Sequence, residues 1–199
     1  MAQSGLADVI FTPMIYEPAK LFLPTNGEEQ TDYGYMFTIL RHPVERAVHM
    51  FYYLKDATWD PLYNDKLKQM TIKEYARSSY VESNWLTRML SNQPGGELTE
   101  EHVRLAKEVL RRKFLVGNFQ DMKFSMKRFE KRFGWYAADE ETEACEEAII
   151  ADKMSKYNDV PMISENSETW ELLVDRNKYD MDVYDFASML FMNQKSKNN

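Results

Sequence analysis

The chain has 199 residues, is 44% hydrophobic and carries a formal net charge of −7 at pH 7, which suits one globular domain and argues against a disordered protein. The acidic balance also argues against nonspecific binding to nucleic acid. With one cysteine, Cys145, no intrachain disulfide can form, and three histidines without paired spacing predict no metal site. No run of about eighteen apolar residues occurs, so we expect no membrane segment in this chain.

The N-terminal part of the sequence predicts little regular structure. Val9, Ile10 and Phe11 suggest a short strand, which Pro13 would break. The polar stretch at 25–34 is typical of a loop. We therefore divide the chain into an irregular segment (1–34), a folded domain (35–194) and a polar tail (195–199) that should fray.

The most informative stretch is a strand that leads directly into a helix. Residues 35–40 are apolar, aromatic or β-branched, which is typical of a buried strand. Arg41 ends this run, and Pro43 suits the first position of a helix that should extend to about residue 57. Ligands bind where strands end in open α/β sheets, and a helix N-terminus favours an anion. The sequence therefore predicts a phosphate site at Arg41.

The rest of the domain is predicted to be mostly helical. The capping signals are Thr71, Thr99 and Ser83, the last for a helix at 85–90. The later elements expected in chain order are a buried strand at 114–116, a helix of about fifteen residues through 122–133, a loop near 157–166, and helices near 168–176 and 180–193. Gly117 should permit a close backbone approach after its strand.

Two charge runs allow two interpretations. Residues 104–132 are rich in lysine and arginine, and residues 139–147 are acidic. Such runs usually form solvated helix faces. Alternatively, the basic run could form the rim of a site for an anionic glycan or nucleotide.

Four short motifs, in this order, resemble those of sulfotransferases. The first, RHPVERAVH at 41–49, resembles the 3′-phosphate-binding segment R-x-P-x-x-R-x-x-S. The others are NWLTRML at 84–90, FLVG at 114–117 with Gln120 and Ser125, and NKYD at 177–180 with Tyr184 and Phe186. Together they are similar to Golgi-type carbohydrate sulfotransferases related to heparan sulfate 2-O-sulfotransferase, over about residues 35–194.

This resemblance implies an α/β fold, a partial P-loop-NTPase-like three-layer arrangement with a small parallel sheet and predominantly helical content. It also implies 3′-phosphoadenylyl sulfate (PAPS) as cosubstrate, no metal, and transfer of a sulfuryl group to a hydroxyl, often on a carbohydrate. Arg41 would bind the 3′-phosphate, with Arg46 and His49 assisting. His49 stands where the family has serine; it can donate a hydrogen bond but is bulkier and titrates.

Each of these assignments has a structural alternative. Arg41 could be an ion-pair residue at a strand end, and Arg46 could brace a neighbouring carboxylate. His49 could be a packed polar residue. Asn84 and Arg88 would orient the substrate by resemblance, but a role in helix packing is at least as well supported.

The family's 5′-phosphosulfate loop, which carries glycine and lysine near the start of the domain, has no counterpart among the seven glycines. We therefore expect a truncated or degenerate domain whose catalytic base is not identifiable. Three hypotheses follow: a PAPS-dependent transferase, a non-catalytic nucleotide-binding remnant, or an α/β interaction protein with a structural Arg41. The resemblance implies a Golgi location and a glycan acceptor, although family members carry a membrane anchor that this sequence lacks.

Overall fold

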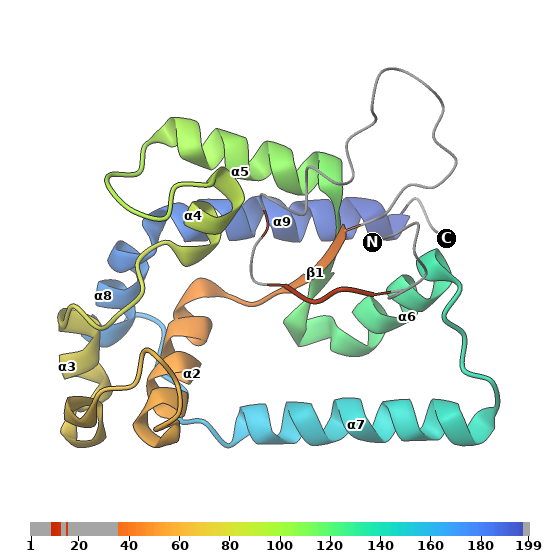
Figure 1. Ribbon diagram of the computed structural model, residues 1–199, viewed down its shortest axis with the longest axis horizontal. Helices are drawn as coiled ribbons and strands as arrows, with labels where there is room; N and C mark the ends of the chain where they lie inside the picture. The colour runs from red at the N-terminus through yellow and green to blue at the C-terminus, as the bar shows by residue number, and fades with distance from the viewer. Residues whose placement is uncertain (1–8, 13–14, 16–35, 197–199) are drawn as a thin grey trace.

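The computed structural model describes residues 9–12, 15 and 36–196, and these are mostly helical around a small parallel sheet (Figure 1). The elements in chain order are β1 (Met36–Leu40), α2 (Pro43–Asp56), the 3-10 helix η2 (Asp65–Gln69), α3 (Ile72–Arg77), α4 (Trp85–Ser91), α5 (Glu100–Lys113), β2 (Phe114–Asn118), the 3-10 helix η3 (Phe119–Asp121), α6 (Met122–Phe133), α7 (Glu140–Asn158), α8 (Glu168–Arg176) and α9 (Lys178–Ser196). This composition agrees with the α/β class that the sequence predicts.

The two predicted strands pair in parallel. Met36 lies opposite Phe114, and Leu40 lies opposite Asn118 at the other end of the ladder. Because parallel strands run in the same direction, both carboxyl ends reach one edge of the sheet. Arg41 and Phe119, the residues that follow the two strands, therefore emerge side by side.

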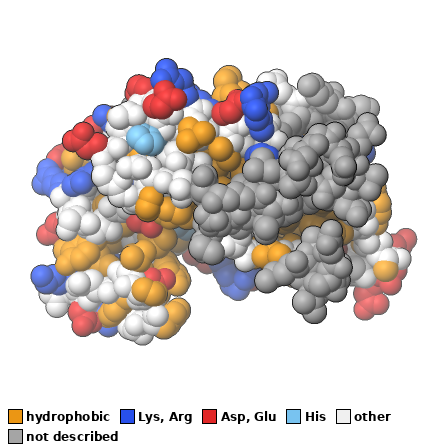
Figure 2. Space-filling model, turned by 45° about the horizontal axis from the view of Figure 1, so that its top comes forward, with side chains coloured by type: hydrophobic (Ala, Val, Ile, Leu, Met, Phe, Trp, Pro, Cys, Tyr) orange, Lys and Arg blue, Asp and Glu red, His pale blue; other side chains and the backbone are white. Residues whose placement is uncertain are grey.

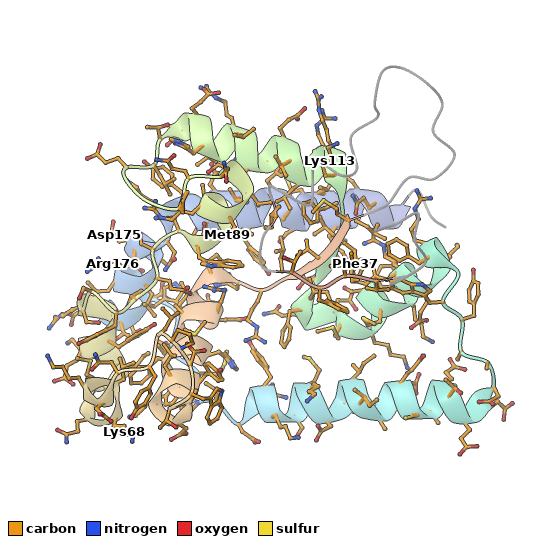
Figure 3. The ribbon with its side chains drawn as sticks, viewed as in Figure 1. Phe37, Lys68, Met89, Lys113, Asp175 and Arg176 are labelled. Atoms are coloured by element: carbon orange, nitrogen blue, oxygen red, sulfur yellow. The ribbon has the colours of Figure 1, made fainter. Side chains whose placement is uncertain are left out.

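The strands separate α9 from α6, because successive side chains of a strand point to opposite faces. Val116 is buried in one core cluster with Val183 and Phe191 of α9. On the other face, the ring of Phe37 contacts the ring of Phe129 of α6, with 4.9 Å between their centres (Figure 3). The sheet is thus covered by helices on both sides, as its apolar strands require.

A second core cluster lies between α2, η2, α3 and α8. Its fully buried members include Val44 and Phe51 of α2, Leu67 of η2, Tyr75 of α3 and Leu173 of α8. The helix predicted from Pro43 is confirmed, and so is the capping box at Thr71, whose hydroxyl accepts from the Glu74 N–H. This cluster fixes α2 and thereby the direction in which α2 leaves Arg41.

The longest element that the sequence analysis does not predict is α7 (Glu140–Asn158), whose last two residues also fall where a loop was expected. None of its 19 residues is buried, so the sequence has no apolar stripe that would have revealed a helix. Its start is favourable nonetheless: Asp139 accepts a hydrogen bond from the Thr142 N–H at 2.8 Å, and acidic residues fill the first turn.

Three smaller predictions are also corrected. Asn84, and not Ser83, takes the N-cap position of α4, in a left-handed conformation with φ of 54°. Residues 9–12 form no strand, although the ring of Phe11 meets that of Phe37 edge-on. Helix α9 extends past the predicted end, to Ser196. The predicted loop at 25–34 lies outside the described residues.

Gly117 provides a test of how closely α6 approaches the sheet. A Cβ atom there would lie 2.9 Å from Cζ of Phe129, 3.0 Å from Cβ of Ser125 and 3.2 Å from Cγ1 of Ile39. Since the Cβ of Ser125 moves only with the α6 backbone, Gly117→Ala should lower the free energy of unfolding by about 1–3 kcal/mol. Urea denaturation would measure this, with Gly95→Ala, where no atom lies within 4 Å, as the control. Equal stability of Gly117→Ala and the wild type would contradict the packing described.

Candidate functional site

Arg41 lies against two neighbouring aromatic rings at the edge where both strands end. Its guanidinium carbon is 3.7 Å from the centre of the Phe119 ring and 4.7 Å from that of the Tyr157 ring. These rings come from the residue after β2 and from the last turn of α7. Burial lowers the pKa of Arg41, but a guanidinium keeps its charge at any pH that proteins tolerate. The site is therefore a half-buried, fixed positive charge.

No described residue accepts a hydrogen bond from the guanidinium of Arg41 or forms an ion pair with it, although the charge of Glu45 acts on it. The neighbouring carboxylate, Glu45 in the first turn of α2, is bound by other groups. It accepts from Nε2 of Gln120 at 2.9 Å and from the hydroxyl of Tyr157 at 2.8 Å. The N–H groups of Arg41 thus have no acceptor among the described residues, and an external anion could supply one.

Tyr157 remains a neutral hydrogen-bond donor in this arrangement. Burial and the hydrogen bond to Glu45 raise its pKa to about 12. Its ring also stacks on that of His49, with 4.3 Å between ring centres and 1° between ring planes. Tyr157 therefore connects Arg41, Glu45 and His49.

His49 is an uncharged member of the site. Burial, and secondly the positive charge of Arg41, lower its pKa to about 4. Its Nε2 atom is buried and has no hydrogen-bond partner among the described residues. A neutral imidazole can donate one hydrogen bond, so His49 can contribute polarity without adding charge.

Arg46, the third predicted nucleotide-binding residue, belongs to a different contact. Its Nη1 lies 2.8 Å from the Glu82 carboxylate, and its guanidinium carbon lies 4.4 Å from the centre of the Trp85 ring. Glu45 and His49 are four residues apart and share one side of α2, whereas Arg46 is turned about 100° from Glu45. The structure thus brings Arg41 and His49 together and gives Arg46 a counterion elsewhere.

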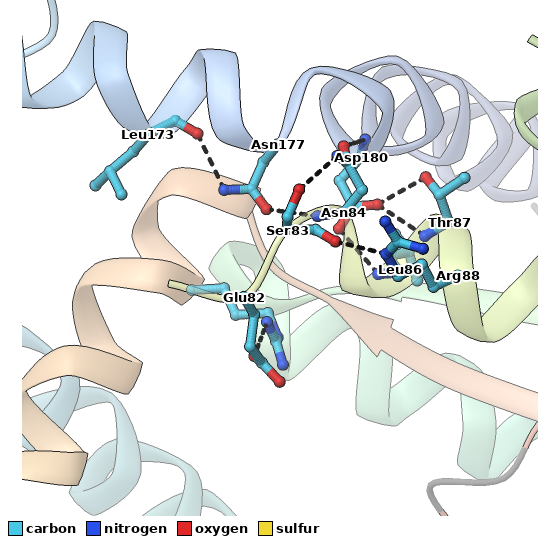
Figure 4. Close-up of polar contacts among 10 residues, drawn as sticks. Glu82, Ser83, Asn84, Leu86, Thr87, Arg88, Leu173, Asn177 and Asp180 are labelled. Carbon is cyan, nitrogen blue, oxygen red and sulfur yellow. Dashed lines mark hydrogen bonds and ion pairs between the residues drawn. The ribbon is translucent and has the colours of Figure 1, made fainter. Parts of the chain in front are cut away.

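Asn84 joins the start of α4 to the start of α9 (Figure 4). Its side-chain oxygen accepts from the N–H groups of Tyr179 at 2.8 Å and Asp180 at 3.2 Å. In return, the Asp180 carboxylate accepts from the N–H groups of Leu86 at 2.9 Å and Thr87 at 2.7 Å. Each helix N-terminus is therefore capped from the other element, which satisfies donors that a helix leaves unpaired.

Arg88 binds backbone carbonyls around α4. Its Nε donates to Ser83 at 3.0 Å, and its Nη1 donates to Gln93 and Gly96 at 3.3 and 3.1 Å. The polar groups of Asn84 and Arg88 thus have partners within the protein, which supports the helix-packing alternative. Their role in substrate binding stays a prediction.

Asn84 also borders a cavity of about 450 Å³ at the end of α8. Its walls carry three cations, Arg77, Arg176 and Lys178, and one carboxylate, Asp175. Figure 3 labels Arg176 and Asp175 there, and both are exposed. On the face shown in Figure 2, acidic and basic side chains of the described residues are mixed.

Four members of the site around Arg41 were not predicted from the sequence: Glu45, Phe119, Gln120 and Tyr157. The position of Phe119 directly after β2 was a usable signal, because the logic that places Arg41 at the sheet edge applies to it equally. Tyr157 had no such signal, because it ends a helix without an apolar stripe.

Comparisons with known proteins do not extend this description: no family model, curated protein or solved structure matches the chain. Within the residues that the structure describes, no helix is both long and apolar enough to cross a bilayer. Nor do these residues include a group of three or more His, Cys, Asp or Glu side chains placed to hold a metal ion. The function of the chain must be inferred from its own residues.

His49 should make stability depend on pH. Its pKa is 6.5 ordinarily and about 4 in the folded protein, so the unfolded chain binds the proton more tightly. The stabilisation is complete above about pH 6.5 and is lost as the pH falls towards 4. His49→Phe keeps an aromatic ring on Tyr157 and removes the titration, so its free energy of unfolding should fall less over this range. His42, whose pKa burial also lowers, retains part of the slope. Denaturant titrations at several pH values with identical slopes for both proteins would contradict this.

The hydrogen bonds by which Asn84 and Asp180 cap the N-termini of α9 and α4 should contribute more to stability than a surface ion pair on α9. Asp180→Ala leaves the buried N–H groups of Leu86 and Thr87 without their acceptor and should lower the free energy of unfolding by about 3 kcal/mol. Asp182→Ala, which removes an exposed pair with Lys107, is the matched control and should cost less than about 1 kcal/mol. If urea denaturation gives similar losses in the free energy of unfolding for Asp180→Ala and Asp182→Ala, these capping hydrogen bonds contribute little.

Proposed function

We propose that the chain is a sulfotransferase-like protein that binds the 3′-phosphate of PAPS, or of its desulfated product adenosine 3′,5′-bisphosphate (PAP), at Arg41. The observation that carries this proposal is that no described residue accepts a hydrogen bond from Arg41 or forms an ion pair with it. Phe119 and Tyr157, whose ring centres are 4.9 Å apart, lie on the same side of the guanidinium and accept no hydrogen bond from it, so its N–H groups remain for the oxygens of a phosphate. A purely structural arginine would instead be expected to have a counterion, as Arg46 does.

The surroundings of Arg41 also support an anion. The site lies beside the start of α2, where the helix dipole favours negative charge. Glu45 opposes this through its own charge, but the hydrogen bonds from Gln120 and Tyr157 reduce that effect. His49 can donate a hydrogen bond and adds no competing negative charge.

The finer fold assignment is part of the same proposal. Two parallel strands with helices on both faces are consistent with part of a P-loop-NTPase-like three-layer domain. The four sequence motifs support this assignment and a Golgi location. The 5′-phosphosulfate loop has no counterpart among the described residues, which omit 16–35.

The reaction would transfer the sulfuryl group to an acceptor hydroxyl. The S–O bond to the phosphate would break, a new S–O bond to the acceptor oxygen would form, and the hydroxyl proton would pass to a base. No described residue is assigned as that base. A carbohydrate acceptor with acidic groups would suit the cavity beside Asn84, because Arg77, Arg176 and Lys178 border it.

A second candidate is a nucleotide-binding protein without transfer activity. The observation that favours it is that the described residues offer a phosphate site but no assigned base. It predicts that PAP binds and that PAPS is not converted to PAP when acceptor glycans are added. Chromatography that measures the release of PAP from PAPS distinguishes the two candidates.

Calorimetric titration with PAP tests the phosphate site itself. Arg41→Ala removes a charge-assisted contact, so PAP affinity should fall by about 1.5–3 kcal/mol, or roughly tenfold to 150-fold. Arg111→Ala, which removes an exposed arginine paired with Glu108, is the matched control and should bind like the wild type. If Arg41→Ala and the wild type give the same titration curve, Arg41 is not the phosphate site.

A further inference from the structure

Helix α7 is held to the rest of the protein by few contacts. It lies along the lower edge of the molecule in Figure 1, below α6 and α9. None of its 19 residues is buried. A cavity of about 340 Å³ separates it from α6, with Met126 and Ile150 among the residues that face this space. Apolar burial, the main force that fixes helices in place, therefore contributes little here.

The N-terminal half of α7 is joined to α6 by two exposed ion pairs. Nζ of Lys123 lies 2.5 Å from Glu147, and Nζ of Lys127 lies 3.5 Å from Glu143. Exposed pairs of this kind contribute little to stability and are screened by salt. They can hold α7 in one orientation without preventing its release.

The C-terminal end of α7 carries the residue that covers the candidate site. Tyr157 lies over the guanidinium of Arg41, stacks on His49 and donates a hydrogen bond to Glu45. The hydrogen-bonded backbone of α7 connects its two ends, so we expect that loosening its pairs with α6 also loosens the Tyr157 end.

We propose that α7 is a movable cover for the Arg41 site. In the structure described here it is closed, with Tyr157 over Arg41 and His49. When the pairs with α6 break, Tyr157 leaves Glu45, and the guanidinium and the buried Nε2 of His49 become accessible. The inference that α7 regulates ligand entry rests on the proposed phosphate site.

The test measures exposure of Arg41 without any nucleotide. Phenylglyoxal modifies accessible guanidinium groups, and peptide mass spectrometry gives the rate at each arginine. In Lys123→Gln/Lys127→Gln, which removes both ion pairs at a distance from Arg41, Arg41 should react about threefold to tenfold faster. Lys107→Gln, which breaks an exposed pair with Asp182 on α9, is the matched control and should leave the rate unchanged. Arg104 provides an exposed reference within each protein.

Tyr157→Ala sets the rate expected for an uncovered site. An Arg41 rate in Lys123→Gln/Lys127→Gln equal to that of the wild type would overturn the proposal, as would an equal increase in Lys107→Gln or no increase in Tyr157→Ala. Far-ultraviolet circular dichroism checks that each variant is folded. The PAP titration is a separate test. If PAP does not bind but the reactivity of Arg41 rises in Lys123→Gln/Lys127→Gln, the proposed nucleotide site is wrong and the proposed role of α7 as a cover still holds.

Discussion

The parallel pairing of β1 and β2 is the constraint on which the candidate site depends. It places the residue after each strand, Arg41 and Phe119, at one edge of the sheet. The pairing is in turn fixed by packing, since Val116 is buried against α9 and Gly117 allows α6 to approach the other face. A shift of one residue in the register of β1 and β2 would turn every side chain of one strand to the opposite face of the sheet and separate Arg41 from Phe119.

Two arginines near the site differ in whether they form an ion pair, and this difference supports the proposed anion site at Arg41. Arg41 and Arg46 lie five residues apart, and both contact aromatic rings, but only Arg46 has a carboxylate partner among the described residues. Glu45, the carboxylate whose charge acts on Arg41, accepts hydrogen bonds from Gln120 and Tyr157 instead. A charge that is partly removed from water and left without a counterion is costly, and an anionic ligand would compensate for that cost.

An element can be predicted from the sequence when the force that stabilises it leaves a local pattern of residues. The strand before Arg41 and the helix from Pro43 were predicted because apolar periodicity and proline have local signatures. Tyr157 was missed because α7 is stabilised by capping and surface charge, which leave no apolar period. The link from Asn84 to Asp180 was missed because its partners are 96 residues apart. Contacts of that kind depend on tertiary structure and have no local signal.

The most direct test of the account is a crystal structure of the protein with PAP. Bound PAP should place the oxygens of one phosphate group about 3 Å from the guanidinium nitrogens of Arg41, in two parallel hydrogen bonds, next to Phe119. A structure in which PAP binds elsewhere, with solvent alone at the Arg41 guanidinium, would contradict it.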